Sequence, residues 1–273
     1  GDVYKRQVQL SPDTRAGNWD ACAGYHYDDS TLKGFSHTHL SGTGCIDLGD
    51  VLFRPTTQKP DLTAETLCLP AAFSHKEEEA SAGYYSVVLK EEGIKVELTA
   101  TAHAGVHRYT FPAGKEAAVI IDLAHLLDNE HIYEATLEQT SDYEIAGMRR
   151  TRGWTDNQYV YFVAQFSKPF KTVDFVQERK PVATQAKLTG THLQACLAFD
   201  NSDGEPLVAK VGLSVVSEKN ARENLEFEVA DFDFDTVRSA ARTAWEQALS
   251  AIVVEGGNAD DRKIFYTALY HSM

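Results

Sequence analysis

A long succession of short segments with strand character constrains the fold of this chain more than any other feature. The segments cover residues 84–89, 94–100, 107–111, 117–123, 133–139, 143–150, 158–166, 173–177, 192–199 and 207–216. Each is apolar or alternates between apolar and polar residues, as strands do. Turn signals separate them, among them Lys90-Glu91-Glu92-Gly93 and Asn201-Ser202-Asp203-Gly204. No helical periodicity interrupts the run, so the sequence predicts a mainly β protein built as a large antiparallel β-sandwich.

After residue 231 the apolar period changes from that of a strand to that of a helix. Apolar residues recur at spacings of three and four at positions 237, 240, 241, 244, 245, 248, 249 and 252, which predicts a helix with Asp235 as its N-cap. Residues 253–257 end in Gly256-Gly257 and break this helix. A second helix is predicted beyond them, capped by Asn258 or Asp260.

Residues 34–55 form the segment richest in chemistry-bearing side chains. The first half holds Ser36, His37, Thr38, His39, Ser41 and Thr43 among three glycines, and the second half turns apolar at Val51-Leu52-Phe53. A polar, glycine-containing loop held by a strand is a common way to present a binding site. His37 and His39 are two apart, so on a strand they share a face, which suits either a metal pair or a hydrogen-bonded pair in a packed loop. Asp47 and Asp50 are either partners of such a metal or caps of turns.

The motif Gly34-Phe-Ser-His-Thr-His-Leu-Ser-Gly-Thr-Gly44, followed by Asp47-Leu-Gly-Asp50, resembles the signature of glycoside hydrolase family 92. Residues 8–14 and 24–27 resemble the same family upstream, and residues 254–257 and 264–271 resemble it downstream. The resemblance implies a calcium-dependent exo-α-mannosidase that acts on mannose-rich glycans by an inverting mechanism. It also implies that the first helix links the sandwich to an (α/α)6 catalytic barrel, of which the second helix is the first element.

The same resemblance guides the assignment of site residues. An exposed tryptophan beside Asn18 and Asp20 suits the face of a pyranose, or it is a packing anchor, and the family favours the first interpretation for Trp19. The predicted substrate-binding residues are therefore Trp19, His37, His39, Ser41 and Thr43. No catalytic residue and no metal ligand is assigned, because the family's acid, base and most calcium ligands belong to the barrel.

Charge and composition narrow the class of partner. The net charge of −14 argues against nucleic acid and anionic membranes and fits a neutral sugar. No apolar run is long enough to span a bilayer. Four cysteines, at positions 22, 45, 68 and 196, match no zinc motif and are too sparse for a disulfide framework. The expected location is periplasmic, cell-surface or secreted in a bacterium, with the signal region outside this sequence.

The two ends indicate a gene fragment. Residues 1–7 resemble a translated sequencing adapter and are excluded from fold reasoning. We expect the sandwich over residues 8–232, the linker helix over 233–257 and the start of a truncated barrel over 258–273. The expected partners are mannose-containing glycans and the chain's own C-terminal barrel.

An alternative to the enzyme is a non-catalytic, carbohydrate-binding β-sandwich module. Apolar helical faces at Trp245 and at Ile264-Phe265 favour the enzyme, because a free-standing module would not need them. Two further features receive no chemistry: Trp154 is expected in the core or an interface, and Arg149, Arg150 and Arg152 are expected on the surface.

Overall fold

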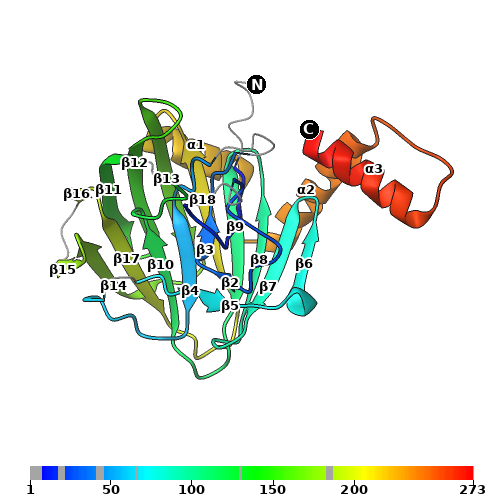
Figure 1. The fold of residues 1–273 in the computed structure, drawn as a ribbon. Helices are drawn as coiled ribbons and strands as arrows, with labels where there is room; N and C mark the ends of the chain where they lie inside the picture. Colours follow the sequence, from blue (N-terminus) through cyan, green and yellow to red (C-terminus); the bar gives the residue numbers. More distant parts are fainter. Residues whose placement is uncertain are drawn as a thin grey trace.

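The structure, a computed structural model, describes residues 8–17, 22–40, 46–64, 67–128, 131–182 and 187–272. Within these residues two large antiparallel sheets pack face to face (Figure 1), one of seven strands and one of nine. This confirms the predicted β-sandwich. A small extra sheet pairs β2 (Thr31–Leu32) with β5 (Ala71–Ala72), and a short 3-10 helix, η2 (His75–Glu77), follows it.

In spatial order the seven-stranded sheet contains β1 (Ser11–Asp13), β3 (Gly34–Ser36), β4 (Leu52–Thr56), β10 (Ala117–Asp122), β17 (Leu193–Phe199), β14 (Phe170–Gln177) and β15 (Lys180–Val182). The nine-stranded sheet contains β16 (Leu188–Gly190), β11 (His131–Ser141), β12 (Glu144–Arg152), β13 (Gln158–Phe166), β18 (Leu207–Ser214), β9 (Ala104–Thr110), β8 (Ile94–Ala100), β7 (Tyr84–Leu89) and β6 (Glu78–Ser81). Every predicted strand segment from residue 84 onward overlaps a strand of one of these two sheets, with ends that differ by up to three residues.

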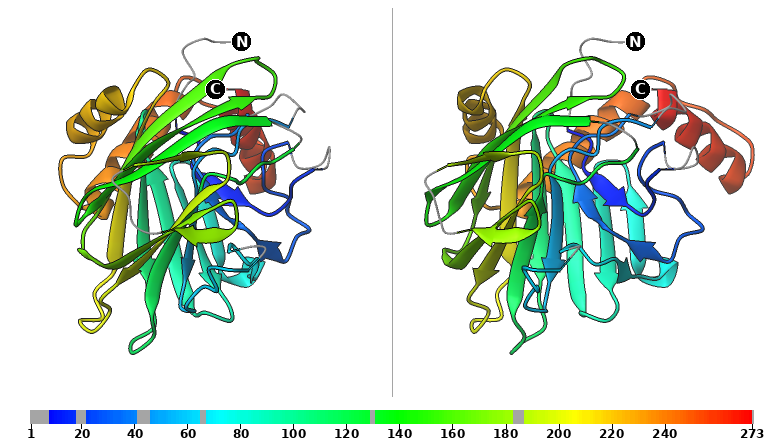
Figure 2. Two further views of the ribbon diagram at one scale, coloured as in Figure 1. Left: turned by 90° about the vertical axis from the view of Figure 1, so that its left-hand side faces the viewer. Right: turned by 60° about the vertical axis from the view of Figure 1, so that its left-hand side comes forward.

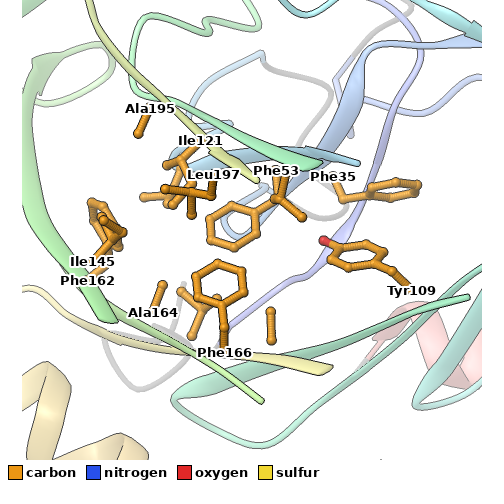
Figure 3. Packing of buried hydrophobic residues seen from close by; sticks show 14 of the residues in the cluster. Phe35, Phe53, Tyr109, Ile121, Ile145, Phe162, Ala164, Phe166, Ala195 and Leu197 are labelled. Atoms are coloured by element: carbon orange, nitrogen blue, oxygen red, sulfur yellow. The ribbon is translucent and has the colours of Figure 1, made fainter. Parts of the chain in front are cut away.

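The main core lies between the two sheets and is rich in aromatic rings (Figure 3). Phe53 of β4 stacks on Phe166 of β13, with ring centroids 6.2 Å apart, and so joins the two sheets. Both rings are completely buried, as are those of Phe35 and Phe162. Burial of such side chains, each worth about 1.5–3 kcal/mol of transfer free energy, is what holds the sheets together.

The two predicted turns, at residues 90–93 and 201–204, connect strands in different ways. Gly93 has φ of +68° and closes the hairpin that pairs Leu89 with Ile94. Gly204 has φ of +67° in the second turn, which joins β17 of one sheet to β18 of the other. The Asn201–Gly204 turn is therefore a crossover between the layers of the sandwich.

Three helices follow the last strand, and the first of them, α1 (Glu218–Glu228), is absent from the sequence prediction. Its N-cap is Ser217, whose Oγ accepts a hydrogen bond from the Asn220 N–H. Ala221 and Leu225 are buried on the outer face of the nine-stranded sheet, where Gly212 of β18 lets the helix approach closely. The run Ala221, Leu225 and Val229 at intervals of four was the available signal.

The next two helices match the predicted pair. Helix α2 (Phe234–Leu249) is capped by Asp233 and not by Asp235, because the Asp233 carboxylate accepts from the Thr236 N–H. Asn258 precedes α3 (Ala259–Ser272) and accepts from the N–H groups of Asp260 and Asp261, as one of the two predicted caps. Figure 1 and the right-hand view of Figure 2 show α3 projecting from the sandwich, and it has no buried side chain.

The sequence analysis placed the buried Arg149 at the surface, and it placed the exposed Trp154 in the core or an interface. Arg149 points inward from β12 and its side chain has no exposed area, because Asp50 and backbone carbonyls surround it. Trp154 is 72% exposed at the turn between β12 and β13, so it is not a core residue. Residues 1–7, predicted to be adapter-derived, lie outside the described residues. Among those that are described, no helix has the length and apolar character to cross a membrane.

Candidate functional site

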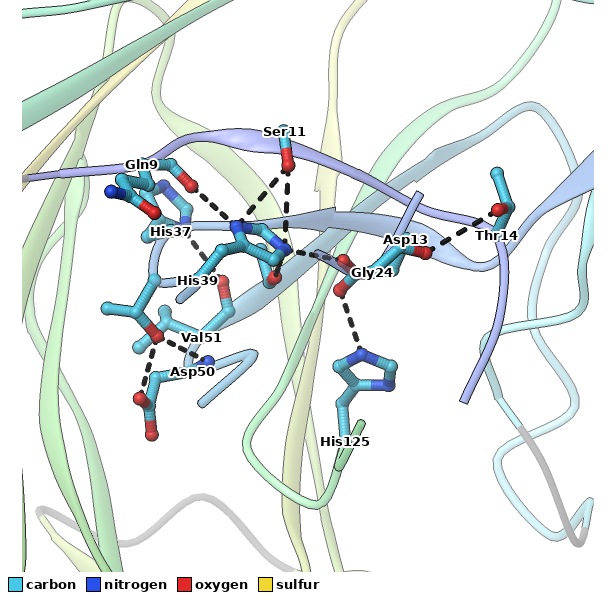
Figure 4. A network of polar contacts seen from close by, with 12 residues as sticks. Gln9, Ser11, Asp13, Thr14, Gly24, His37, His39, Asp50, Val51 and His125 are labelled. Atoms are coloured by element: carbon cyan, nitrogen blue, oxygen red, sulfur yellow. Dashed lines mark hydrogen bonds and ion pairs between the residues drawn. The ribbon is translucent and has the colours of Figure 1, made fainter. Parts of the chain in front are cut away.

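Three stretches of chain, far apart in sequence, meet at the segment 34–50. The Gln9 N–H donates to the His37 carbonyl at 3.0 Å, and the His37 N–H donates to the Asp50 carbonyl at 3.0 Å. Leu127 packs against Gly49. Strand β12 and its following turn reach the same place through Arg149 and Trp154. Most of the polar side chains gathered there are buried, so the segment rests on a polar cluster instead of an apolar one (Figure 4).

His39 is held by oxygen atoms on both sides of its ring. Its Nδ1 lies 2.7 Å from the Gln9 carbonyl oxygen, and its Nε2 lies 2.6 Å from Asp13 Oδ1 (Figure 4). A carbonyl and a carboxylate can only accept, so both ring nitrogens donate and His39 is an imidazolium. Burial alone would lower the pKa of His39, but the adjacent Asp13 charge and hydrogen bonds raise it.

Asp13 is completely buried and joins two imidazoles. Its Oδ2 accepts from His125 Nε2 at 2.9 Å, while its Oδ1 accepts from His39 Nε2. Burial would raise the pKa of Asp13, yet the His39 charge and the two hydrogen bonds hold that pKa well below its usual range. Asp13 is therefore an anion between two rings, and it links β1 to the segment 34–50 and to the turn that follows β10.

His37 belongs to a different arrangement, in the core between the sheets. Its Nδ1 donates to the Val51 carbonyl at 2.7 Å, which leaves Nε2 as an acceptor for His107 Nε2–H at 3.0 Å. The other nitrogen of His107 then accepts from the Tyr109 hydroxyl at 2.8 Å. Every proton in this chain of three groups has a defined place, and all three groups are neutral. Burial lowers the pKa of His37 to about 4 and that of His107 well below its ordinary value.

Asp50 and Arg149 form a second buried ion pair, with Nε 2.9 Å from Oδ1 and both side chains essentially unexposed. The other oxygen of Asp50 accepts from the Thr38 hydroxyl at 2.7 Å. Arg149 also donates to the carbonyl oxygens of Leu123 and His125. One guanidinium thus ties the segment 34–50 to the turn that carries His125.

Asp47 has a related role three residues earlier. It is 3% exposed, and its two oxygens accept from the N–H groups of Leu48 at 2.9 Å and of Trp154 at 3.1 Å. Asp47 and Asp50 are thus turn-forming and anchoring groups, which was one of the two interpretations left open by the sequence. Neither carboxylate is free to act as a catalytic acid or base.

The predicted substrate-binding residues divide into two groups. Trp19, Ser41 and Thr43 lie outside the described residues. His37 and His39 are described and buried, and their nitrogens are taken by protein groups. They do not share a face as expected, because β3 ends at Ser36 and His39 sits in an isolated bridge to Leu48. The described residues contain no group of three or more His, Cys, Asp or Glu side chains placed to hold a metal ion.

Sequence reasoning missed Asp13, His125, Arg149 and Trp154 as members of this region. Asp13 stood in a stretch quoted only for family resemblance, and His125 and Arg149 had no local pattern around them. Their association is purely tertiary, so one sequence offers no signal for it. Trp154 had a weak signal, since it follows a glycine and precedes Thr155-Asp156-Asn157, a polar turn sequence.

The described residues thus form a two-layer β-sandwich that leads into helices, with a buried polar cluster around residues 36–39 and 47–50. The family model for the "Glycosyl hydrolase family 92 N-terminal domain" matches residues 7–214, and the model for the "Glycosyl hydrolase family 92 catalytic domain" matches residues 220–273. This chain belongs to glycosyl hydrolase family 92.

Solved structures agree with this assignment. A family GH92 alpha-mannosidase from Bacteroides thetaiotaomicron is 36% identical, with a TM-score of 0.91 over 97% of this chain and 37% of its own. An inverting mannosidase of the same family and organism is 26% identical, with a TM-score of 0.80 over 97% of this chain and 35% of its own. An uncharacterized secreted glycosidase from Arthroderma benhamiae is 27% identical over 92% of this chain and 36% of its own length. The chain thus spans little more than a third of these relatives.

Proposed function

We propose that this chain is the N-terminal part of an exo-α-mannosidase that releases mannose from mannose-rich glycans with inversion. The observation that carries the proposal is the overlay on the Bacteroides alpha-mannosidase, with 36% identity and a TM-score of 0.91 over nearly the whole chain. That relative has also been solved in complex with mannoimidazole. The inverting step is supported by the second mannosidase, which is described as inverting.

In this proposal the sandwich lines one side of the sugar pocket. Trp19, Ser41 and Thr43 are the proposed direct contacts. His37 and His39 belong to the same proposal as groups that hold the segment from beneath, since both are buried and fully hydrogen-bonded. Inverting hydrolysis needs one carboxylic acid for the leaving oxygen and one carboxylate for water. We assign neither to this chain, because the buried carboxylates Asp13, Asp47 and Asp50 are all engaged by protein groups.

Calcium enters the proposal through the family resemblance alone. The described residues do not fit a calcium site: Ca²⁺ takes six to eight oxygen ligands, and the acidic side chains of the cluster already satisfy histidines, an arginine and backbone N–H groups. We therefore derive no step through calcium. The proposed partners are mannose-containing glycans and a C-terminal catalytic barrel, and the proposed location is periplasmic, cell-surface or secreted, as the name of the Arthroderma relative supports.

The experiment compares two proteins: this chain, and this chain continued by the remainder of a family 92 catalytic domain. We expect the longer protein to hydrolyse an aryl α-mannoside and the present chain not to, because the catalytic carboxylates lie outside it. NMR of the first turnover should show β-mannose, the product of inversion. Release of α-mannose would contradict the inverting mechanism. Turnover by the present chain would contradict the proposal that the catalytic carboxylates lie outside it.

The second candidate function is a non-catalytic sugar-binding sandwich. The match of residues 220–273 to the catalytic-domain model favours the enzyme over it. Glycan binding without turnover by the longer protein would favour the module instead.

A further inference from the structure

The turn between β12 and β13 presents an aromatic ring to solvent on a well-held backbone. Trp154 is 72% exposed, and residues 153–157 around it are all exposed. The turn is closed by a hydrogen bond from the Gly153 N–H to the Thr155 carbonyl at 3.1 Å. An indole combines a large apolar ring with a polar N–H, so on a backbone held in this way it is suited to contact a partner that has both apolar and polar groups.

The segment 34–50 fixes this turn at two points. The buried Asp47 carboxylate accepts from the Trp154 N–H, and Gly153 makes this possible because a Cβ there would clash with the same carboxylate. Five residues before Trp154, the buried Arg149 pairs with Asp50. Both carboxylates of the motif Asp47-Leu48-Gly49-Asp50 therefore bind the same hairpin, and they hold the Trp154 backbone next to Asp47.

The surroundings of the ring favour a saccharide over an apolar protein surface. The neighbours of Trp154 in the turn are Gly153, Thr155, Asp156 and Asn157, all exposed, which carry a hydroxyl, a carboxylate and an amide; the amide oxygen of Asn157 accepts from Arg150. Sugar sites combine an aromatic ring with such polar groups, because a pyranose has an apolar C–H face and a rim of hydroxyls. A protein partner would instead favour a contiguous apolar area, which the residues of this tip do not form.

We propose that Trp154 stacks on a sugar unit of the glycan beyond the mannose that is released, and that Asp47 is the positioning residue that holds it there. The released unit of an exo-acting enzyme must be enclosed, whereas a ring that is 72% exposed suits a unit farther out along the glycan. This inference rests on the proposed function and adds a determinant of substrate choice to it.

The test uses the present chain labelled with 5-fluorotryptophan, so that Trp19, Trp154 and Trp245 each give one fluorine resonance, assigned with single Trp→Phe variants. The chain is titrated with α-linked mannobioses into the millimolar range, where weak sugar binding is visible. We expect the Trp154 resonance to shift and saturate while that of Trp245 stays constant, and to respond less to cellobiose. A Trp154 resonance that does not move, or that responds equally to cellobiose, would overturn the proposal.

Kinetics of the longer protein provide a second, independent test of the proposed role of Trp154. Trp154→Ala should weaken kcat/KM for a mannose oligosaccharide roughly three- to tenfold, the range expected for one aromatic contact, mainly through KM. It should leave an aryl mannoside unaffected, since that substrate has no outer sugar. Asp47→Ala should weaken kcat/KM for the oligosaccharide at least as much as Trp154→Ala, and Trp154→Phe should retain most of the activity. Tyr143→Ala, which removes another exposed ring at the opposite end of β12, is the matched control.

The two hypotheses fail in different ways. If the longer protein hydrolyses both substrates and Trp154→Ala changes neither, the role of Trp154 is wrong and the proposed function stands. If no α-mannoside is hydrolysed while the Trp154 resonance still responds selectively, the proposed function is wrong and the saccharide contact stands.

Discussion

His37 and His39 are two residues apart and both are buried, but His37 is neutral and His39 is a cation. His37 hydrogen-bonds to a carbonyl and to another imidazole, and burial lowers its pKa to about 4. His39 hydrogen-bonds to a carbonyl and to a carboxylate, and Asp13 raises its pKa against the effect of burial. The protonation state of a buried histidine is thus decided by the one partner that differs, an imidazole in the first case and a carboxylate in the second.

The neutral hydrogen-bonded chain and the charged pair should differ in how they contribute to the stability of the fold. The neutral chain from Tyr109 through His107 to His37 lies among the core aromatics, where Phe53 stacks on His107 with centroids 5.2 Å apart. The charged pair of Asp13 and His39 lies under the segment 34–50 and joins separate loops. We expect the neutral chain to be partly replaceable by apolar groups. The charged pair should tolerate loss of one member poorly, since the other becomes an unpaired buried charge.

The largest expected effect comes from breaking the charged pair. Asp13→Ala leaves the His39 imidazolium buried without its counter-ion, and loss of one partner of a buried pair costs about 3–5 kcal/mol. Urea unfolding of the variant should show this as a large fall in the midpoint. Asp13→Asn is the matched control with the same shape, and we expect it to be less damaging because the amide still fills the space. Equal stability of wild type and Asp13→Ala would refute the charged assignment.

The pH dependence of stability should have opposite signs for the two histidines. For His37 the folded pKa of about 4 lies below the unfolded value of 6.5, so its contribution to stability is present above pH 6.5 and is lost as pH falls toward 4. The loss is about 1.4 kcal/mol per pH unit, or roughly 3 kcal/mol over that interval. For His39 the folded pKa is raised, so its contribution is present below pH 6.5 and is lost as pH rises through the folded pKa.

Single variants separate the pH dependence contributed by His37 from that contributed by His39. The free energy of unfolding is measured from pH 4 to pH 9 for wild type, His37→Gln and His39→Gln. The difference between wild type and His37→Gln should shrink toward acid, and the difference between wild type and His39→Gln should shrink toward alkali. If the stability differences for His37→Gln and His39→Gln both shrink at the same end of the pH range, the assignment of one neutral and one cationic ring is wrong.

Replacing the central member of the neutral chain should have an intermediate effect. His107→Phe leaves His37 Nε2 and the Tyr109 hydroxyl without partners, at a cost of about 1–3 kcal/mol. Adding Tyr109→Phe removes one of those orphaned groups, so the double variant should be no less stable than His107→Phe alone. Thermal unfolding of His107→Phe, Tyr109→Phe and the double variant tests this, and a double variant that loses the sum of the two single losses would contradict it.

The sequence predicted the local features of this molecule well and its tertiary polar contacts poorly. Alternation in 84–89 and 94–100 and the glycine at 93 define a hairpin without help from elsewhere in the chain. Arg149 instead lies in a strand with two other arginines, which looks like a solvated face, and only the fold brings Asp50 to it. Helix α1 was missed for a related reason: Gly212 on a distant strand creates the space that makes its short apolar stripe a packing face.

The candidate site shows the same division at the level of single residues. The sequence singled out the motif at 34–50, but the side chains outside it that set the protonation of its two histidines include Asp13 and His107. No spacing rule links those positions to residues 37 and 39. The prediction that these histidines share a face failed because the strand ends at Ser36, a boundary that the glycines and hydroxylated residues around it left undefined.

Removal of metal ions should have the smallest effect on stability. This experiment tests whether the charged pair of Asp13 and His39 is part of a metal site. The carboxylate of Asp13 already accepts from two imidazoles at 2.6 and 2.9 Å, and Asp50 already pairs with Arg149, so neither offers a hard cation the oxygen ligands it needs. EDTA followed by exchange into buffer should therefore leave the thermal midpoint of the present chain unchanged, and added Ca²⁺ should not raise it. A ligand that binds only the folded chain would raise the midpoint by mass action. A calcium-dependent increase that disappears in Asp13→Asn or Asp50→Asn would show that this cluster exchanges its protein partners for a metal ion.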